Sequence, residues 1–214
     1  MWFMILTVVF AHFLALLSPG PDFILVVKSG VRNSKRNALG IAVGIAAANA
    51  AYIALCIVGI GEILSRSLIV MKVLKVCGGL FLTYVAIMAL KSRKKDYAFL
   101  LDKEATARDG GSSFIREFFT GFVSGITNPK NLIFYLSLFS VVLTAGIDMR
   151  VKIGLGAWMT LLVFAWDAAI LFVLSKRAVR GVFSRIAFYV DKVAGTILGL
   201  IGVRLIETAI LEDR

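Results

Sequence analysis

The sequence predicts an all-α membrane protein of six transmembrane helices, arranged as a 3+3 inverted repeat with spans 1 and 4 broken at prolines. Three observations lead to this fold class. The 214-residue chain is 59% hydrophobic and only 17% charged, with a mean hydropathy of +0.90, more apolar than a soluble domain of this length needs. Its apolar residues form stretches of about 20 residues. Its three prolines occur at two sites deep inside such stretches.

Six apolar stretches are each long enough to cross a hydrocarbon core about 30 Å thick. They lie at 4–27, 39–63, 73–90, 117–145, 153–175 and 193–211. The first stretch lacks a basic leader and a small-residue cleavage site, so we expect a retained span rather than a signal peptide. With an even number of spans, both termini lie on the same side of the membrane.

Basic residues mark the side of the membrane on which each connection lies. Sixteen of the 24 lysines and arginines occur in segments 28–38, 91–116 and 176–192. The positive-inside rule therefore places these segments in the cytoplasm and both termini outside. The same clustering explains the net charge of +11 through orientation and contact with the lipid bilayer, and no nucleic-acid partner is expected.

The halves of the predicted repeat are residues 1–90 and 117–211 of a single domain spanning 1–214. The most polar segment, 91–116, is predicted to be a cytoplasmic linker between them. Three spans in each half give the halves opposite orientations. Asn49-Ala50-Ala51 and Asp167-Ala168-Ala169 are one pair of matching positions, although chance similarity between apolar segments is the alternative.

The two proline breaks have the sequences SPGPD at 18–22 and TNPKN at 127–131. Proline removes a backbone donor and clashes with the preceding helical turn. Inside a bilayer the freed backbone groups must face protein or a water-filled cavity. Half-helices that begin at Pro21 and Lys130 direct the positive ends of their dipoles toward the midplane, which suits the carboxylate of an amino acid. Interrupted segments in corresponding halves therefore predict a transporter's binding site.

Polar side chains flank both breaks. Lys130 supplies a positive charge, and Asp22 and Asp167 are intramembrane carboxylates that we expect to take an ammonium group or a proton. Alternatively, the breaks only bend helices, and Lys130 snorkels or pairs with one of these carboxylates. Asn49 either lines the pathway or hydrogen-bonds between helices. The predicted substrate-binding residues are Pro19, Gly20, Pro21, Asp22, Asn49, Asn128, Pro129, Lys130 and Asn131, and the predicted proton-coupling residues are Asp22 and Asp167.

Other residues are expected to have structural roles. Glycines spaced four apart, at 40/44, 121/125 and 195/199, allow close helix approach. Arg204 and Glu207 lie one helical turn apart and are expected to pair. Cys56 and Cys77 are expected to be buried and inert. No metal or other cofactor is expected.

The chain contains the motifs SPGPDF at 18–23, LGIAVGIAAANAAY at 39–52 and GFVSGITNPKNLIFYLSLF at 121–139. These motifs resemble those of the LysE/RhtB amino-acid exporter family, and the segments at 74–91 and 193–205 also fit. The resemblance covers nearly the whole chain. It implies a multi-pass protein of the bacterial inner membrane, not an enzyme, that exports small amino acids or their derivatives from the cytoplasm. It also suggests coupling to the proton gradient. The substrate would bind at the midplane between the broken spans. The resemblance does not identify the amino acid that is exported. It also leaves open whether the protein forms a homo-oligomer.

Two other classes of protein are alternatives to an exporter. An intramembrane hydrolase with Ser124 as nucleophile and His12 as base requires that these side chains meet across helices. A thiol–disulfide electron-transfer protein requires a reactive cysteine pair near the breaks, whereas Cys56 and Cys77 lie in the second and third spans. The sequence favours the exporter over both.

Overall fold

In the computed structural model, residues 2–18, 20–60, 68–101, 112–144, 147–174 and 177–211 are described, and every element within these ranges is helical. The predicted all-α class is confirmed. The elements are α1 (Trp2–Leu17), α2 (Pro21–Arg32), α3 (Lys35–Leu55), the π-helical turn η1 (Cys56–Ile60), α5 (Leu68–Lys91), the 3₁₀ helix η2 (Lys94–Leu101), α6 (Phe114–Thr127), α7 (Pro129–Thr144), α8 (Met149–Val173) and α9 (Arg177–Leu211).

Several of these helices are long and apolar enough to cross a membrane. By length and composition, Lys35–Val58, Met149–Val173 and Arg185–Leu211 can each cross one. Met4–Leu17 and Pro21–Arg32 together make a fourth candidate, bent by 54° at the intervening break. Apolar helices compatible with a membrane protein are therefore present, while the count of six spans and the inverted repeat stay predictions.

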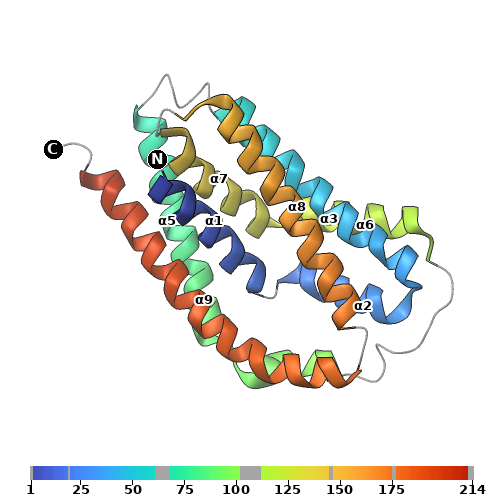
Figure 1. The fold of residues 1–214 in the computed structure, drawn as a ribbon. Coiled ribbons are helices and arrows are strands. Elements are labelled where there is room, and N and C mark those ends of the chain that lie inside the picture. Colours follow the sequence, from blue (N-terminus) through green and yellow to red (C-terminus); the bar gives the residue numbers. More distant parts are fainter. Residues whose placement is uncertain are drawn as a thin grey trace.

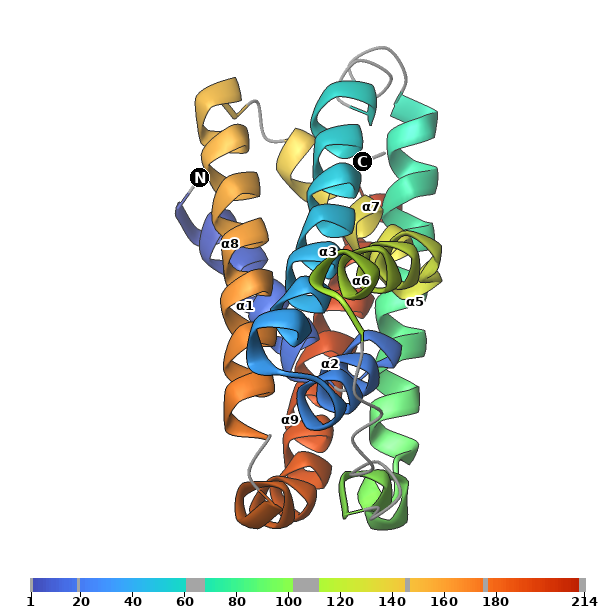
Figure 2. The same ribbon diagram turned by 90° about the vertical axis from the view of Figure 1, so that its right-hand side faces the viewer.

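The helices pack side by side in one bundle (Figures 1 and 2). Both ends of the described chain lie toward one end of the bundle, and η2 lies at the opposite end beside the start of α9 (Figure 1). The long helix α3 packs along α6 and α8, and α5 packs along α9 and α7. The short helices α1 and α7 lie between these groups (Figure 1), so the ends of broken segments face the interior.

Glycines allow the backbones of α3 and α6 to touch. A Cβ atom added to Gly44 would lie 2.1 Å from the carbonyl oxygen of Phe118, and one added to Gly121 would lie 2.3 Å from that of Ile41. Both distances are far below van der Waals contact. The predicted glycine pairs 40/44 and 121/125 thus face each other, as small residues do where membrane helices approach closely. This contact fixes α6 against α3 and sets the position of the second break.

The connections are more helical than predicted. Helix α9 begins at Arg177 instead of near 193, so most of the expected loop 176–192 is helix. Its early side chains Val179, Phe183 and Phe188 pack against a hydrophobic core cluster, which explains why the helix continues through this basic segment. The expected linker contains η2, which packs on α9. Residues 102–111 of that linker lie outside the described part.

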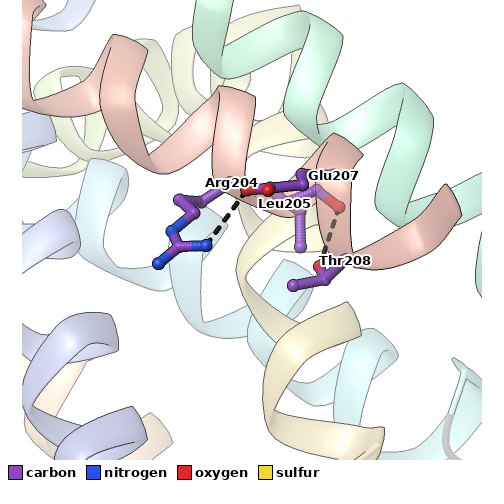
Figure 3. Close-up of polar contacts among 4 residues, drawn as sticks. All are labelled: Arg204, Leu205, Glu207 and Thr208. Carbon is purple, nitrogen blue, oxygen red and sulfur yellow. Dashed lines mark hydrogen bonds and ion pairs between the residues drawn. The ribbon is translucent and has the colours of Figure 1, made fainter. Parts of the chain in front are cut away.

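The predicted ion pair on α9 is formed, whereas one of the two cysteines is not buried as predicted. Figure 3 shows the predicted pair on α9, in which Arg204 Nη1 donates to Glu207 Oε2 at 3.0 Å. Cys56 is buried, but Cys77 is exposed, so its predicted burial was wrong. The neighbouring Gly78 packs against α7, and Cys77 lies on another face of α5.

Candidate functional site

Two helix junctions bring together the predicted break segments. Helix α1 ends at Leu17 and α2 begins at Pro21, with Gly20 as its N-cap; Pro19 lies outside the described residues. Gly20 offers no side-chain acceptor, so the first-turn amides of α2 have no side-chain cap. At the other junction, the Asn128 Oδ1 accepts a hydrogen bond from the Lys130 backbone N–H at 3.0 Å, while Pro129 takes the first helical position of α7.

Asp22 connects the two junctions through three hydrogen bonds. Its Oδ1 accepts from Ser124 Oγ at 2.7 Å. Its Oδ2 accepts from Asn128 Nδ2 at 3.0 Å and from Asn131 Nδ2 at 2.9 Å. These donors come from α6, from the residue between α6 and α7, and from α7. Asp22 therefore joins α2 to both segments of the second break. Sequence reasoning missed Ser124 as a partner, although it lies one turn before Asn128 on the same face.

The Lys130 ammonium lies at the end of α1. Its Nζ donates to the carbonyl oxygens of Ser18 at 3.1 Å and Ala15 at 3.4 Å. A Cβ atom on Gly20 would lie 3.5 Å from the same nitrogen, so Lys130 also lies against the start of α2. Within the described ranges, no ion pair joins Lys130 to Asp22 or Asp167. The alternative in which Lys130 pairs with one of these carboxylates is therefore not observed among the described residues.

A cavity of about 70 Å³ lies at the junctions. This volume is well below the range of about 300–1,000 Å³ that is usual for small-molecule sites. Most of its polar lining was predicted from the sequence. The predicted residues that line it are Gly20, Asp22, Asn49, Asn128, Lys130, Asn131 and Asp167, whereas Pro21 lines a neighbouring cavity.

Asp167 and Asn49 face this cavity with different hydrogen bonding. Asp167, on α8, is 6% exposed, and its Oδ2 has no hydrogen-bond partner among the described residues. Asn49 donates from Nδ2 to the Ile45 carbonyl of its own helix at 2.7 Å, so that bond is within α3 rather than between helices. An unpaired buried carboxylate oxygen is unfavourable and needs a donor or a proton.

The residues of the hydrolase alternative have other partners. Ser124 donates to Asp22, and His12 Nε2 lies 3.2 Å from the Tyr135 hydroxyl. His12 is also packed against the rings of Phe134 and Trp158. No nucleophile–base pair is formed between Ser124 and His12. In the described part of the chain, no group of three metal-ligating side chains comes together.

A second, larger cavity of about 630 Å³ borders the same junctions. It is walled by α5, η2 and α9, and one of its lining residues is Asp191, which is 5% exposed. The Tyr97 hydroxyl donates to Asp191 Oδ2 at 2.5 Å. Burial, and then this hydrogen bond, raise the pKa of Tyr97 above its usual range, so the phenol stays protonated as a donor. Sequence reasoning missed both residues because each lay in a predicted loop.

Comparison with known proteins gives the family. Residues 13–208 match the profile of the family described as LysE type translocator. The chain is 27% identical over 208 residues to a threonine efflux protein of Salmonella typhimurium, covering 96% of this chain and 98% of the relative. Identity to the threonine efflux protein of Escherichia coli is 26% over 207 residues, with 96% and 98% covered.

A homoserine/homoserine lactone efflux protein of Salmonella typhi is 30% identical over 123 residues, which cover 58% of this chain and 56% of that protein. No solved structure matches the chain. The family profile spans both helix junctions and the helices that enclose the cavities. The chain therefore belongs to the LysE type translocator family.

Proposed function

We propose that this protein is a proton-coupled secondary exporter that moves a small amino acid or amino-acid derivative out of the bacterial cytoplasm. Threonine and homoserine are the first candidates, because relatives are named for efflux of threonine and of homoserine and its lactone. We place the substrate at the midplane between the α1–α2 and α6–α7 segments. The single observation that supports this site best is the position of Lys130.

Lys130 brings a positive charge to the start of α2. Its ammonium lies against Gly20 at the start of α2, where the dipole is positive and no side chain caps the first amides. Its ammonium donates hydrogen bonds to the carbonyls of Ala15 and Ser18. A substrate carboxylate bound between Lys130 and the α2 amides would complete the hydrogen bonding of both.

We assign proton coupling to Asp22 and Asp167. Both line the smaller cavity, where Asp167 has an oxygen without a partner in the described structure. Asp22 links α2 to α6 and α7, so losing its hydrogen bonds would release the two broken segments from each other. Since the cavity of about 70 Å³ must grow to hold an amino acid, such a release fits an exporter that rocks one half against the other.

The proposed membrane arrangement follows the sequence. Six spans form a 3+3 inverted repeat, with both termini extracytoplasmic and η2 on the cytoplasmic side. The packing of α3 on α8 and of α5 on α9 supports the repeat, because each contact joins corresponding spans of the two halves. The positions of the basic segments support the orientation.

Transport by the purified protein in liposomes tests this proposal. We expect labelled threonine or homoserine to exchange across the membrane in counterflow, and an imposed pH gradient to drive net transport that a protonophore abolishes. Empty liposomes serve as the control. Failure of the folded protein to transport homoserine or any of the standard amino acids would overturn the proposed function, and transport insensitive to the pH gradient would overturn the coupling.

Asp22→Asn is expected to reduce export at least tenfold at unchanged membrane abundance. Asparagine has an NH₂ group in place of one carboxylate oxygen. Both Asp22 oxygens accept hydrogen bonds, from Ser124, Asn128 and Asn131, so the new NH₂ group would lie against at least one other donor and that hydrogen bond would be lost. Loss of one hydrogen bond to a charged group is worth about 1.5–3 kcal/mol, and 1.4 kcal/mol is tenfold. Uptake of labelled amino acid into proteoliposomes measures the effect.

Asp148→Asn is the matched control for this substitution. Asp148 is exposed and caps α8 by accepting from the Arg150 backbone N–H at 2.7 Å. Asparagine caps helices about as well as aspartate, so this variant should transport like the wild type. Wild-type transport by Asp22→Asn would show that neither proton coupling nor the hydrogen bonds between the two junctions depend on the Asp22 carboxylate.

A further inference from the structure

The larger cavity has the size and position of an entry chamber to the junctions. Its volume of about 630 Å³ lies within the range of about 300–1,000 Å³ that is usual for small-molecule sites. It shares Ser18, Gly20, Asn128 and Lys130 with the smaller cavity, so the two adjoin. Its other wall is formed by α5, α9 and η2, at the end of the bundle predicted to be cytoplasmic. The larger cavity can therefore hold an amino acid as it stands, whereas the smaller cavity at the junctions must first enlarge.

Two carboxylate residues, Asp96 and Asp191, and two lysines, Lys91 and Lys130, line this chamber. Asp96 and Lys91 are exposed, whereas Asp191 and Lys130 are not. The Asp191 carboxylate is buried on α9, and the Lys130 ammonium lies at the junctions. No ion pair joins Asp191 to Lys130 within the described ranges. The nearby Lys192 ammonium donates instead to the carbonyls of Leu90 and Ser92. The chamber thus presents separate positive and negative groups, which complement the carboxylate and ammonium of a free amino acid.

The two carboxylate oxygens of Asp191 differ, because one accepts a hydrogen bond from the protein and the other has no partner among the described residues. Oδ2 accepts from the Tyr97 hydroxyl at 2.5 Å. Oδ1 is buried and has no hydrogen-bond partner among the described residues. Such an oxygen is stabilised by any donor that reaches it. A primary ammonium group brings three donors and a positive charge.

We propose that this chamber is a loading site in which Asp191 binds the ammonium of the amino acid and Lys130 its carboxylate. The inference rests on the proposed export function and adds a site where the substrate is held before the junctions open. Tyr97 restrains the Asp191 carboxylate in the absence of substrate. The substrate ammonium therefore competes with the Tyr97 hydroxyl for Asp191, which makes η2 a part of the site.

Calorimetric binding to the full-length protein in detergent tests the role of Asp191. L-threonine and L-homoserine are the probes, together with their hydroxy-acid analogues, in which a hydroxyl replaces the α-ammonium. Asp191→Asn is expected to raise the Kd of the amino acids at least tenfold. The same variant should change the Kd of the hydroxy acids less than twofold, because they lack the group that Asp191 binds.

Tyr97→Phe is the second variant and separates binding from a structural role. It removes the competing hydroxyl and leaves the carboxylate, so amino-acid binding should be as tight as in the wild type or tighter. If both variants weaken binding, and do so for amino acids and hydroxy acids alike, Asp191 only positions η2 and the inference is overturned. If Asp191→Asn does not fold, Tyr97→Phe decides alone, and weaker amino-acid binding overturns the inference.

The two proposals fail in different ways. A wild-type protein that transports amino acids in liposomes, while Asp191→Asn keeps the wild-type Kd, overturns the loading site and leaves the export function standing. A folded wild-type protein that transports no amino acid overturns the export function and the loading site with it.

Discussion

Lys130→Met is expected to lower amino-acid export by about ten- to a hundredfold while the helical bundle stays folded. Methionine is unbranched and flexible and fills the space of the lysine stem. It removes the charge that the carboxylate of the substrate would contact. A hydrogen bond to a charged group contributes about 1.5–3 kcal/mol, which corresponds to this range at 1.4 kcal/mol per tenfold. The freed carbonyls of Ala15 and Ser18 lie beside the cavities, where water replaces the ammonium.

Uptake of labelled threonine or homoserine into proteoliposomes measures this loss, with protein abundance and size-exclusion profile checked in parallel. Lys28→Met is the matched control, because Lys28 is exposed on α2 and lines neither cavity. Lys130→Arg should retain part of the activity, since it keeps the charge but has a planar, bulkier head group. If the Lys130→Met variant exports at the wild-type rate, the carboxylate of the substrate does not bind at Lys130.

The composition of the site was predictable because its signals are local. Proline limits the backbone wherever it occurs, so the sequences around Pro21 and Pro129 reveal junctions without knowledge of the fold. Charged and amide side chains next to such junctions are costly in lipid and therefore point inward. Lys130 and Asn131 line the predicted cavity for this reason.

The pairing of those side chains was not predictable. Which groups meet depends on the rotation of each helix, and that rotation is set by packing between segments distant in sequence. Asp22 bonds to Ser124, Asn128 and Asn131 instead of Lys130, because α6 is held against α3 by backbone contact. The sequence showed the glycines of both helices but not which surfaces they join.

The larger cavity was missed for a different physical reason. Asp191 precedes Lys192 in a basic stretch, and charge density there outweighed the apolar residues that keep the segment helical. Tyr97 lies in the most polar part of the chain, yet it is 3% exposed because η2 packs on α9. Hydropathy identifies apolar spans well, but it says little about polar segments that fold back onto them.

Gly44→Ala is expected to destabilise the protein by about 1–3 kcal/mol or more, the usual cost of overpacking. In an open helical position the same change would favour folding by about 1 kcal/mol, through helix propensity. At Gly44 the clash outweighs that gain, because the new Cβ would lie 2.1 Å from the Phe118 oxygen and 2.7 Å from the Phe122 nitrogen. Both are backbone atoms, so no side-chain rotation relieves the contact, and α6 must move away from α3.

Gly154→Ala is the matched control, because a Cβ atom there meets nothing within 4 Å. Thermal unfolding in detergent, followed by tryptophan fluorescence, should show a Tm several degrees lower for Gly44→Ala and equal or higher for Gly154→Ala. Movement of α6 also carries Ser124 and Asn128 away from Asp22, so Gly44→Ala should lose export below its unfolding temperature. Equal melting of the two variants would contradict the α3–α6 register and, with it, the hydrogen-bond network that joins the two helix junctions.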